Sequence, residues 1–184
     1  EVASLGVQVH GGMGFIEETG AAQHYRDARI APIYEGTNGI QAIDLVGRKV
    51  PMEDGAVMDA LCAEMHETVE ALAAAPSLGQ VAGRLGAAIA ALERATDWVL
   101  GNKGPQALAA ATPYLKLAGD VIGGWVLAKH ALVTAAGTDD WSQSKAALAR
   151  FYAAQVLAQV PGLADGVMDG AGDLETVTAQ ALGA

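Results

Sequence analysis

The sequence contains little charge and almost no cysteine. Of its 184 residues, 17% are charged and 52% are hydrophobic, and Cys62 is the one cysteine. A single cysteine excludes an intrachain disulfide and suits a reducing cytoplasm. Its small and apolar neighbours, Ala60, Leu61 and Ala63, predict a buried, structural thiol. The chain can therefore build a sizeable core without disulfides.

Positive charge is scarce as well. The chain has 11 Lys and Arg against 21 Asp and Glu, which gives a net charge of −10 and a pI near 4.6. Nucleic acids reward clustered basic residues, so this balance argues against a nucleic-acid partner and also against an anionic membrane surface. No Gly-x-x-x-x-Gly-Lys phosphate loop is present, and no strand precedes the glycines at 11, 12 and 14, so a Rossmann fingerprint is absent too.

Long uninterrupted apolar runs are also missing. The longest apolar stretch, 107–136, is broken by charged or titratable residues that would be costly at mid-bilayer, namely Lys116, Asp120, Lys129 and His130. We therefore expect no membrane span. The chain begins at Glu1 without a basic region before an apolar run, so we expect no signal peptide. Its first nine residues have the pattern of a helix already under way, which suggests a piece of a longer protein.

The pattern of apolar residues is helical throughout, and no stretch alternates with period two long enough to form a sheet. Helices are expected over 1–9, 20–29, 37–49, 55–75, 79–101, 105–136 and 140–160, with weaker ones over 162–169 and 173–182. The fold class is therefore all-α, most simply a helical bundle. A Pro- and Gly-containing linker at 51–55 divides the chain into two domains, 1–52 and 53–184.

The shorter domain holds two stretches that are not simple helix. Residues 10–14 place three glycines in four positions, which permits positive φ and close approach of another group. A plain helix C-cap explains the same residues. Downstream, Pro32 ends the helix over 20–29, in which Tyr25 and Ile30 are expected to point inward.

A lone carboxylate, Glu35, lies in the second of these stretches, 33–41. Thr37 and Asn38 follow it, and both are good N-cap residues for the helix that comes next. Glu35 is thus expected on a turn before a helix N-terminus, among apolar neighbours. Such a position can keep a carboxylate out of bulk water, and desolvation raises the pKa of a carboxylate towards use as a general base.

Other polar and aromatic residues are better explained structurally. His66 and Glu70 lie four apart, a spacing that metal sites use, but without a second pair we expect a surface polar pair and no metal. Gly123 and Gly124 inside a long helix indicate close helix packing or a kink. The three tryptophans are expected to fill the core or an interface: Trp98, Trp125 and Trp141.

Three blocks in this order and spacing resemble the end of the C-terminal domain of an acyl-CoA dehydrogenase. They are Gln8-Val9-His10-Gly11-Gly12-Met13-Gly14-Phe15, Tyr25-Arg26-Asp27-Ala28-Arg29-Ile30 and Ile33-Tyr34-Glu35-Gly36-Thr37-Asn38-Gly39-Ile40-Gln41. The resemblance covers residues 1 to about 50. The remainder is similar to the extra helical domain that some bacterial members carry after the core, a less specific likeness.

The resemblance implies a reaction. Family members oxidise an acyl-CoA thioester to the trans-2-enoyl-CoA, with a glutamate removing the α-proton and FAD accepting the β-hydride at N5. Glu35 aligns with this base, and Gly36 aligns with a position whose backbone approaches the substrate thioester. The α-proton is weakly acidic, so the base needs a raised pKa and a dry site.

The resemblance also implies a cofactor and partners. Thr37, Asn38 and Gly39 align with FAD contacts, although many members carry a larger polar residue at the position of Gly39, which leaves only a backbone contact here. Gln8, Gly11 and Gly12 align with a segment that contacts the FAD of the neighbouring subunit. Members are accordingly homodimers or homotetramers, and electron-transfer flavoprotein is the expected electron acceptor.

Most of the parent fold would lie outside these residues. We therefore expect Glu35 to be in place but exposed, and the isolated chain to be inactive. One alternative remains open, in which 53–184 is a helical oligomerisation or interaction module of a flavoprotein without dehydrogenase activity. The intact Glu35 speaks against that alternative.

Overall fold

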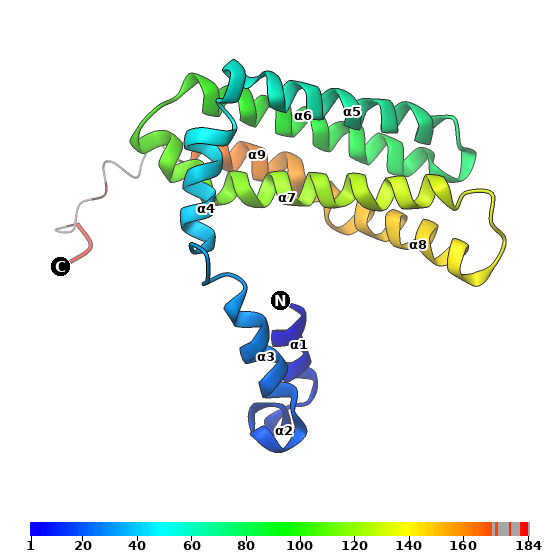
Figure 1. Cartoon of the computed structure of the whole chain (residues 1–184), viewed down its shortest axis with the longest axis horizontal. Helices are drawn as coiled ribbons and strands as arrows, with labels where there is room; N and C mark the ends of the chain where they lie inside the picture. Colours follow the sequence, from blue (N-terminus) through cyan, green and yellow to red (C-terminus); the bar gives the residue numbers. More distant parts are fainter. Residues whose placement is uncertain (171, 173–176, 178–180, 184) are drawn as a thin grey trace. The chain divides into compact units, whose positions relative to one another are not determined.

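The computed structural model describes residues 1–170, 172, 177 and 181–183, and every regular element in that part of the chain is a helix (Figure 1). This confirms the all-α prediction. The weak helix expected over 173–182 falls mainly outside the described residues. The chain forms two compact units, 1–41 and 42–184, which are treated separately below. The predicted boundary at residue 52 stays a prediction.

The first unit is a small helical hairpin. It contains α1 (Val2–Val9), α2 (Gly12–Phe15), the 3₁₀ turn η1 (Glu17–Thr19) and α3 (Ala21–Ile30), and α1 packs against α3. Gly11 takes φ +62° at the start of the turn between α1 and α2. A Cβ at Gly14 would collide with the main-chain oxygen of Val7. The glycine block therefore does both things its composition permits, a left-handed turn and a close approach.

Two residues expected inside this unit lie outside. Tyr25 and Ile30 on α3 are exposed, whereas Ala21 and Ala22 are the buried residues of that helix. The inward prediction was wrong because α3 is covered mainly by one short helix, α1, and this contact buries only Ala21 and Ala22. A helix with one neighbour in its unit leaves most of its surface uncovered.

The second unit is a helical bundle, and most of its helix ends lie within about three residues of the predicted ones. The helix expected over 140–160 is the exception: it ends at Gln155, and Val160 already begins the next helix, because Pro161 is accepted in the first turn of a helix and does not end the one before it. The segment α4 (Asn38–Asp44) leads into it, followed by the π-turn η2 (Leu45–Lys49) and the 3₁₀ turn η3 (Met52–Gly55). The remaining elements are α5 (Ala56–Ala73), η4 (Pro76–Leu78), α6 (Gly79–Gly101), α7 (Pro105–Val133), α8 (Asp140–Gln155), η5 (Leu157–Gln159) and α9 (Val160–Asp169).

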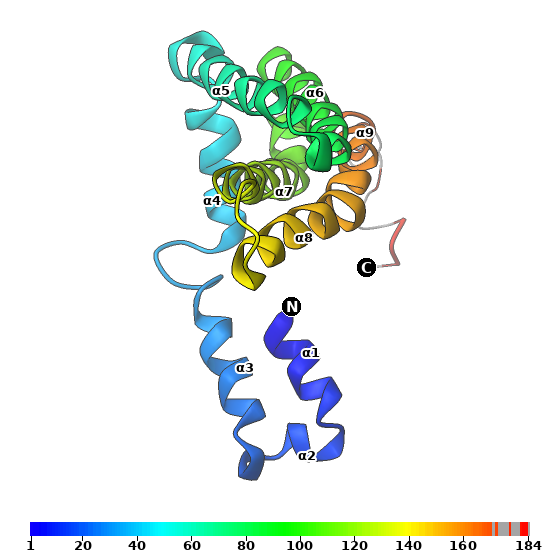
Figure 2. The ribbon, with the colours of Figure 1, turned by 90° about the vertical axis from the view of Figure 1, so that its right-hand side faces the viewer.

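In the bundle, α5 pairs with α6, α7 lies between α5 and α8, and α9 packs on both α6 and α7 (Figures 1 and 2). The core consists of aliphatic and small side chains from all five long helices, with Cys62 buried among them as predicted. Two buried hydrogen bonds fix how the helices face one another. Tyr114 Oη and Thr96 Oγ1 are 2.7 Å apart, and Trp125 Nε1 donates to Thr68 Oγ1 over 2.7 Å.

The paired glycines of α7 make close helix contacts. A Cβ at Gly123 would lie 2.9 Å from the hydroxyl of Tyr152, and one at Gly124 would lie 2.7 Å from a methyl carbon of Leu157. Both glycines therefore lie where a neighbouring side chain approaches too closely for a larger residue, so the prediction of close packing is confirmed.

Of the tryptophans expected in the core or at an interface, Trp125 is buried, Trp98 is partly buried and Trp141 is exposed, with the Lys145 ammonium 4.9 Å from its ring centroid. Trp141 is therefore not a core residue of this chain, and the interface alternative stays a prediction for it. One surface prediction needs correction. His66 pairs with Glu93 on α6 at 2.9 Å rather than with Glu70, because the neighbouring helix offers a closer carboxylate than the next turn of its own.

No group of three or more metal-ligating side chains gathers among the described residues. Within the same part of the chain, none of the helices combines the length and the apolar character that crossing a bilayer requires.

Candidate active-site loop

Glu35 lies on a short closed loop between α3 and α4. The loop begins where α3 ends, with the amides of Ile33 and Tyr34 both bonded to the carbonyl of Ile30, at 2.9 and 3.2 Å. It closes where the amide of Asn38 donates to the carbonyl of Pro32 over 3.2 Å. Pro32 thus ends the helix, as predicted, and also supplies an acceptor that holds the far end of the loop.

The backbone reverses at Glu35 itself. Glu35 has φ +54° and Gly36 has φ +90°, so two consecutive residues are left-handed. For Gly36 this conformation is free of steric cost, but for a residue with a side chain it costs roughly 1–2 kcal/mol. Strain of this kind persists only where surrounding contacts impose it, and such residues gather at functional sites.

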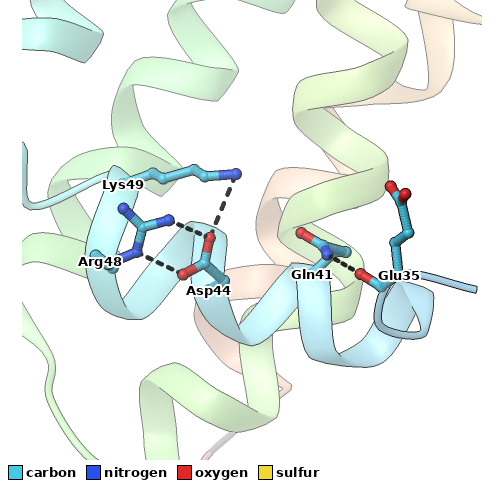
Figure 3. Close-up of polar contacts among 5 residues, drawn as sticks. All are labelled: Glu35, Gln41, Asp44, Arg48 and Lys49. Atoms are coloured by element: carbon cyan, nitrogen blue, oxygen red, sulfur yellow. Dashed lines mark hydrogen bonds and ion pairs between the residues drawn. The ribbon is translucent and has the colours of Figure 1, made fainter.

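The contact that imposes it comes from α4. Gln41 Nε2 donates to the main-chain oxygen of Glu35 over 2.9 Å (Figure 3). The same amide nitrogen would lie 3.1 Å from a Cβ at Gly36. The left-handed conformation of Glu35 and the Gln41 bond could not be deduced from composition, although Gly36 is a residue type that signals a positive φ.

Helix α4 starts as predicted. The amide of Ile40 donates to Thr37 Oγ1 over 3.3 Å, which is the side-chain bond of an N-cap, and α4 begins at Asn38. Since this bond uses Thr37 Oγ1 as an acceptor, the hydroxyl hydrogen remains available to donate to another group.

The carboxylate of Glu35 is exposed and points away from the amide of Gln41 (Figure 3). Among the residues that the structure describes, no group bonds to it or forms an ion pair with it. Glu35 is therefore fixed through its backbone while its side chain is left open, the state that the sequence led us to expect in this chain alone.

The other residues aligned with FAD contacts fall into two sets in the first unit. Gln8 lies in the last turn of α1, Gly11 follows that helix and Gly12 begins α2, and all three are exposed. Gln8 lines a cleft of about 380 Å³ together with Phe15 and Tyr25. A Cβ at Gly11 or Gly12 would meet nothing within 4 Å, so the main chain there is open to a bulky group.

The second set is at the start of α4. Asn38 lines a cleft of about 330 Å³ with Arg29 and Pro32, whereas Glu35, Gly36, Thr37 and Gly39 line neither cleft. The exposed side-chain amide of Asn38, the hydroxyl hydrogen of Thr37 and the main chain of Gly39 could offer hydrogen bonds of the kind that a polar nucleotide cofactor uses. These residues therefore fit FAD, with Gly39 contributing main chain only.

Past this site, an ion cluster holds the π-turn. Arg48 donates from Nε and Nη2 to the two carboxylate oxygens of Asp44 at 2.7 and 2.9 Å, and Lys49 lies 3.3 Å from the same carboxylate (Figure 3). The hydrogen bonds from Arg48 hold the pKa of Asp44 below its ordinary value. Arg48 and Lys49 thus lie at the end of this helical segment and pair with the side chain of Asp44.

The fold and this loop define an all-helical chain with an exposed carboxylate on a left-handed turn between two helices. Residues 1–50 match the family model for the acyl-CoA dehydrogenase C-terminal domain, and residues 61–178 match the model described as acetyl-CoA dehydrogenase C-terminal like. The chain belongs to the acyl-CoA dehydrogenase family.

Curated relatives agree with this assignment. The 3-methylmercaptopropionyl-CoA dehydrogenase of Ruegeria pomeroyi is 47% identical over 169 residues, which cover 86% of this chain and 29% of that protein. A broad-specificity linear acyl-CoA dehydrogenase of Mycobacterium tuberculosis is 30% identical, and the match covers 82% of this chain and 28% of that protein. The butyryl-CoA dehydrogenase of Syntrophomonas wolfei is 31% identical, and the match covers 85% of this chain and 27% of that protein. The chain thus spans less than a third of the length of these relatives.

Proposed function

We propose that this chain is the C-terminal part of an FAD-dependent acyl-CoA dehydrogenase and that Glu35 is its catalytic base. The observation that carries the proposal is the strained left-handed backbone at Glu35, held by Gln41 and Pro32, in a chain of this family. Glycine would adopt φ +54° without strain, so a glutamate there is costly to fold. Glu53 has a similar φ of +52°, and the family match over residues 1–50 supports the role for Glu35 rather than for Glu53.

The proposed reaction converts an acyl-CoA thioester to its trans-2-enoyl-CoA. Glu35 takes the α-proton on a carboxylate oxygen, and the backbone at Gly36 approaches the thioester. Bound FAD would accept the β-hydride at N5. Thr37, Asn38 and Gly39 would hold one FAD, and Gln8, Gly11 and Gly12 would hold that of a neighbouring subunit, in a homodimer or homotetramer that passes electrons to electron-transfer flavoprotein.

Two further points belong to the proposal. Residues 1–52 are the end of the dehydrogenase domain and 53–184 are a helical extension, in a protein of the cytoplasm, where the reduced Cys62 would persist.

The carboxylate of Glu35 is exposed in this chain, and a general base for a weakly acidic proton needs a water-excluding pocket. The 184-residue chain alone should therefore neither hold FAD tightly nor turn over acyl-CoA.

The test is anaerobic flavin reduction by the full-length enzyme, with butyryl-CoA, 3-methylmercaptopropionyl-CoA and longer acyl-CoAs as substrates. Glu35→Gln keeps the size of the side chain and removes the base, so flavin reduction should fall by at least 10³-fold while bound FAD stays unchanged. Glu17→Gln changes another exposed carboxylate of the first unit and should leave the rate as it is. A wild-type rate in Glu35→Gln would end the assignment.

A further inference from the structure

The helical segment after Glu35 belongs to different parts of the chain by sequence and by structure. By sequence, residues 1–50 match the acyl-CoA dehydrogenase C-terminal domain, and the match to the second family model begins only at residue 61. By structure, the first unit ends at Gln41, and the second unit begins at Ala42. The stretch 42–50 is therefore part of the dehydrogenase domain in sequence and part of the bundle in structure.

One face of the stretch 42–50 is fully buried. Ala42, Val46 and Val50 follow one another at intervals of four residues, are 0%, 3% and 0% exposed, and belong to the hydrophobic core of the bundle. The π-turn η2 packs on α7, and Val46 lines a cleft of about 440 Å³ together with Val99 of α6 and Ala107 of α7. These three side chains thus anchor the stretch 42–50 in the bundle.

The π-turn explains how residues four apart share one buried face. In an α-helix a step of four residues exceeds a full turn by about 40°, so a row of such residues winds away from its neighbour. In η2 the amide of Val50 instead bonds to the carbonyl of Leu45, five residues back, over 2.8 Å. Because a π-turn takes more residues per turn than an α-helix, it offsets this drift and keeps the row against the bundle.

The same helical segment carries the residue that holds the loop of Glu35. Gln41, which donates to the Glu35 carbonyl, directly precedes Ala42 in α4. Asp44 and Val50, which flank η2, both have α-helical dihedral angles, so α4 continues into the π-turn without interruption. Figure 3 shows Gln41 and Asp44 on this one segment. An anchor at Ala42 and beyond therefore also restrains the helical turn from which Gln41 reaches Glu35.

We propose that Ala42, Val46 and Val50 are positioning residues for the base, through which the C-terminal bundle holds α4 and, by way of Gln41, the loop of Glu35. The proposal rests on the proposed function of Glu35 and gives the helical extension a part in the reaction. Its physical basis is that a reacting group misplaced by about 1 Å can lose about 10²-fold in rate. Truncating a buried side chain leaves space into which the helix can shift.

Flavin reduction in the full-length enzyme tests the proposal, measured by stopped flow with the acyl-CoA that reduces the wild type fastest. In Val46→Ala/Val50→Ala, the rate constant at saturating substrate should fall about tenfold. The half-saturating substrate concentration and the FAD content should stay within about twofold, because the binding groups are unchanged.

The matched control is Val81→Ala/Val121→Ala, which removes the same groups from residues that are 1% and 0% exposed. At 1.5 Å per residue, Val81 lies roughly 27 Å from Val99 along α6, and Val121 lies roughly 21 Å from Ala107 along α7. This variant should lower the urea midpoint of the 184-residue chain but keep the wild-type rate of flavin reduction in the full-length enzyme. If either double variant does not fold, Val46→Ala against Val81→Ala makes the same comparison.

A double-mutant cycle tests the route through Gln41. If the bundle acts on Glu35 by way of this side chain, Val46→Ala/Val50→Ala should slow a Gln41→Ala enzyme by less than about threefold, because the link is already cut. Effects that multiply in full would overturn the proposal, as would equal rates in the seam variant, Val46→Ala/Val50→Ala, and its control. A wild-type rate in Glu35→Gln would instead overturn the proposed function itself, so the two failures are distinguishable.

Discussion

The side chain of Gln41 holds the main chain of Glu35 through a 2.9 Å hydrogen bond from Nε2 to the Glu35 carbonyl oxygen. The bond joins the first turn of α4 to the left-handed turn, so the proposed base is positioned by a residue that has no chemical role of its own. The side-chain carboxylate of Glu35 takes no part in this hydrogen bond. Positioning and reactivity are thus assigned to different residues of one loop.

Gln41→Ala should slow the full-length enzyme without removing its base. Loss of one hydrogen bond costs about 0.5–1.5 kcal/mol, and misplacement of a reacting group by about 1 Å can cost far more in rate. We expect flavin reduction to fall about tenfold with FAD content unchanged. The control is Gln23→Ala, which removes another exposed side-chain bond of the first unit, to Asp27 at 3.0 Å. Equal rates in the two variants would show that Gln41 does not position the loop.

Gly36→Ala should damage the same loop from the other side. The residue has φ +90°, and the added Cβ would lie 3.1 Å from Gln41 Nε2. Both the backbone at Gly36 and the hydrogen bond from Gln41 to Glu35 would therefore be strained. We expect flavin reduction in the full-length enzyme to fall by more than tenfold. Gly83→Ala on α6 adds a Cβ with nothing within 4 Å and should keep the wild-type rate. A normal rate in Gly36→Ala would mean that the left-handed turn is not needed for activity.

The buried pair of Thr96 and Tyr114 gives a stability prediction for the bundle. Thr96→Val removes the 2.7 Å partner of the Tyr114 hydroxyl and leaves a fully buried polar group unpaired, at a cost of about 1–3 kcal/mol. In urea unfolding of this chain, the double variant Thr96→Val/Tyr114→Phe should recover most of that loss, because no hydroxyl remains to satisfy. Additive losses in the double variant would contradict the pairing.

Alkaline pH should destabilise the bundle. Burial raises the pKa of Cys62 from 9.0 to about 11 and that of Tyr114 from 10.0 to about 12. Both groups are neutral when protonated, and both ionise more easily in the unfolded chain. Their contribution is therefore fully present below pH 9.0 and is lost as the pH rises towards the folded-state values. The free energy of unfolding should fall from pH 9 to pH 11 in wild type, and less steeply in Cys62→Ala/Tyr114→Phe. Identical slopes would rule out these two groups as the cause.

The helices of the second unit were predictable because their ends are set locally. Gly101, Gly104 and Pro105 separate α6 from α7 in the sequence as they do in space, and the Thr37 N-cap appears where its residue type predicted it. Burial at a single position was less predictable, because it depends on neighbours that are distant in sequence. Tyr25, Ile30 and Trp141 have residue types that favour burial, yet all three side chains are exposed.

The candidate site also has one part that could be predicted from the sequence and one part that could not. Glu35 and the glycines could be found from three ordered sequence blocks, but the φ value of Glu35 could not. That value follows from two closures, Asn38 to Pro32 and Gln41 to Glu35, which exist only once α3 and α4 are formed. The partner of His66 was missed for a similar reason, because Glu93 is brought close by the pairing of α5 with α6.

The left-handed backbone at Glu35 has an evolutionary consequence. Glycine and asparagine adopt φ +54° more readily than glutamate, so selection for folding alone would replace Glu35 with one of them. A lineage that lost the activity would gain stability from that change and drift towards it within this loop. Glu53 has φ +52° and no proposed role, so the angle alone does not identify a base; at Glu35 the reason to keep a costly residue comes from its place among the residues that match the acyl-CoA dehydrogenase C-terminal domain.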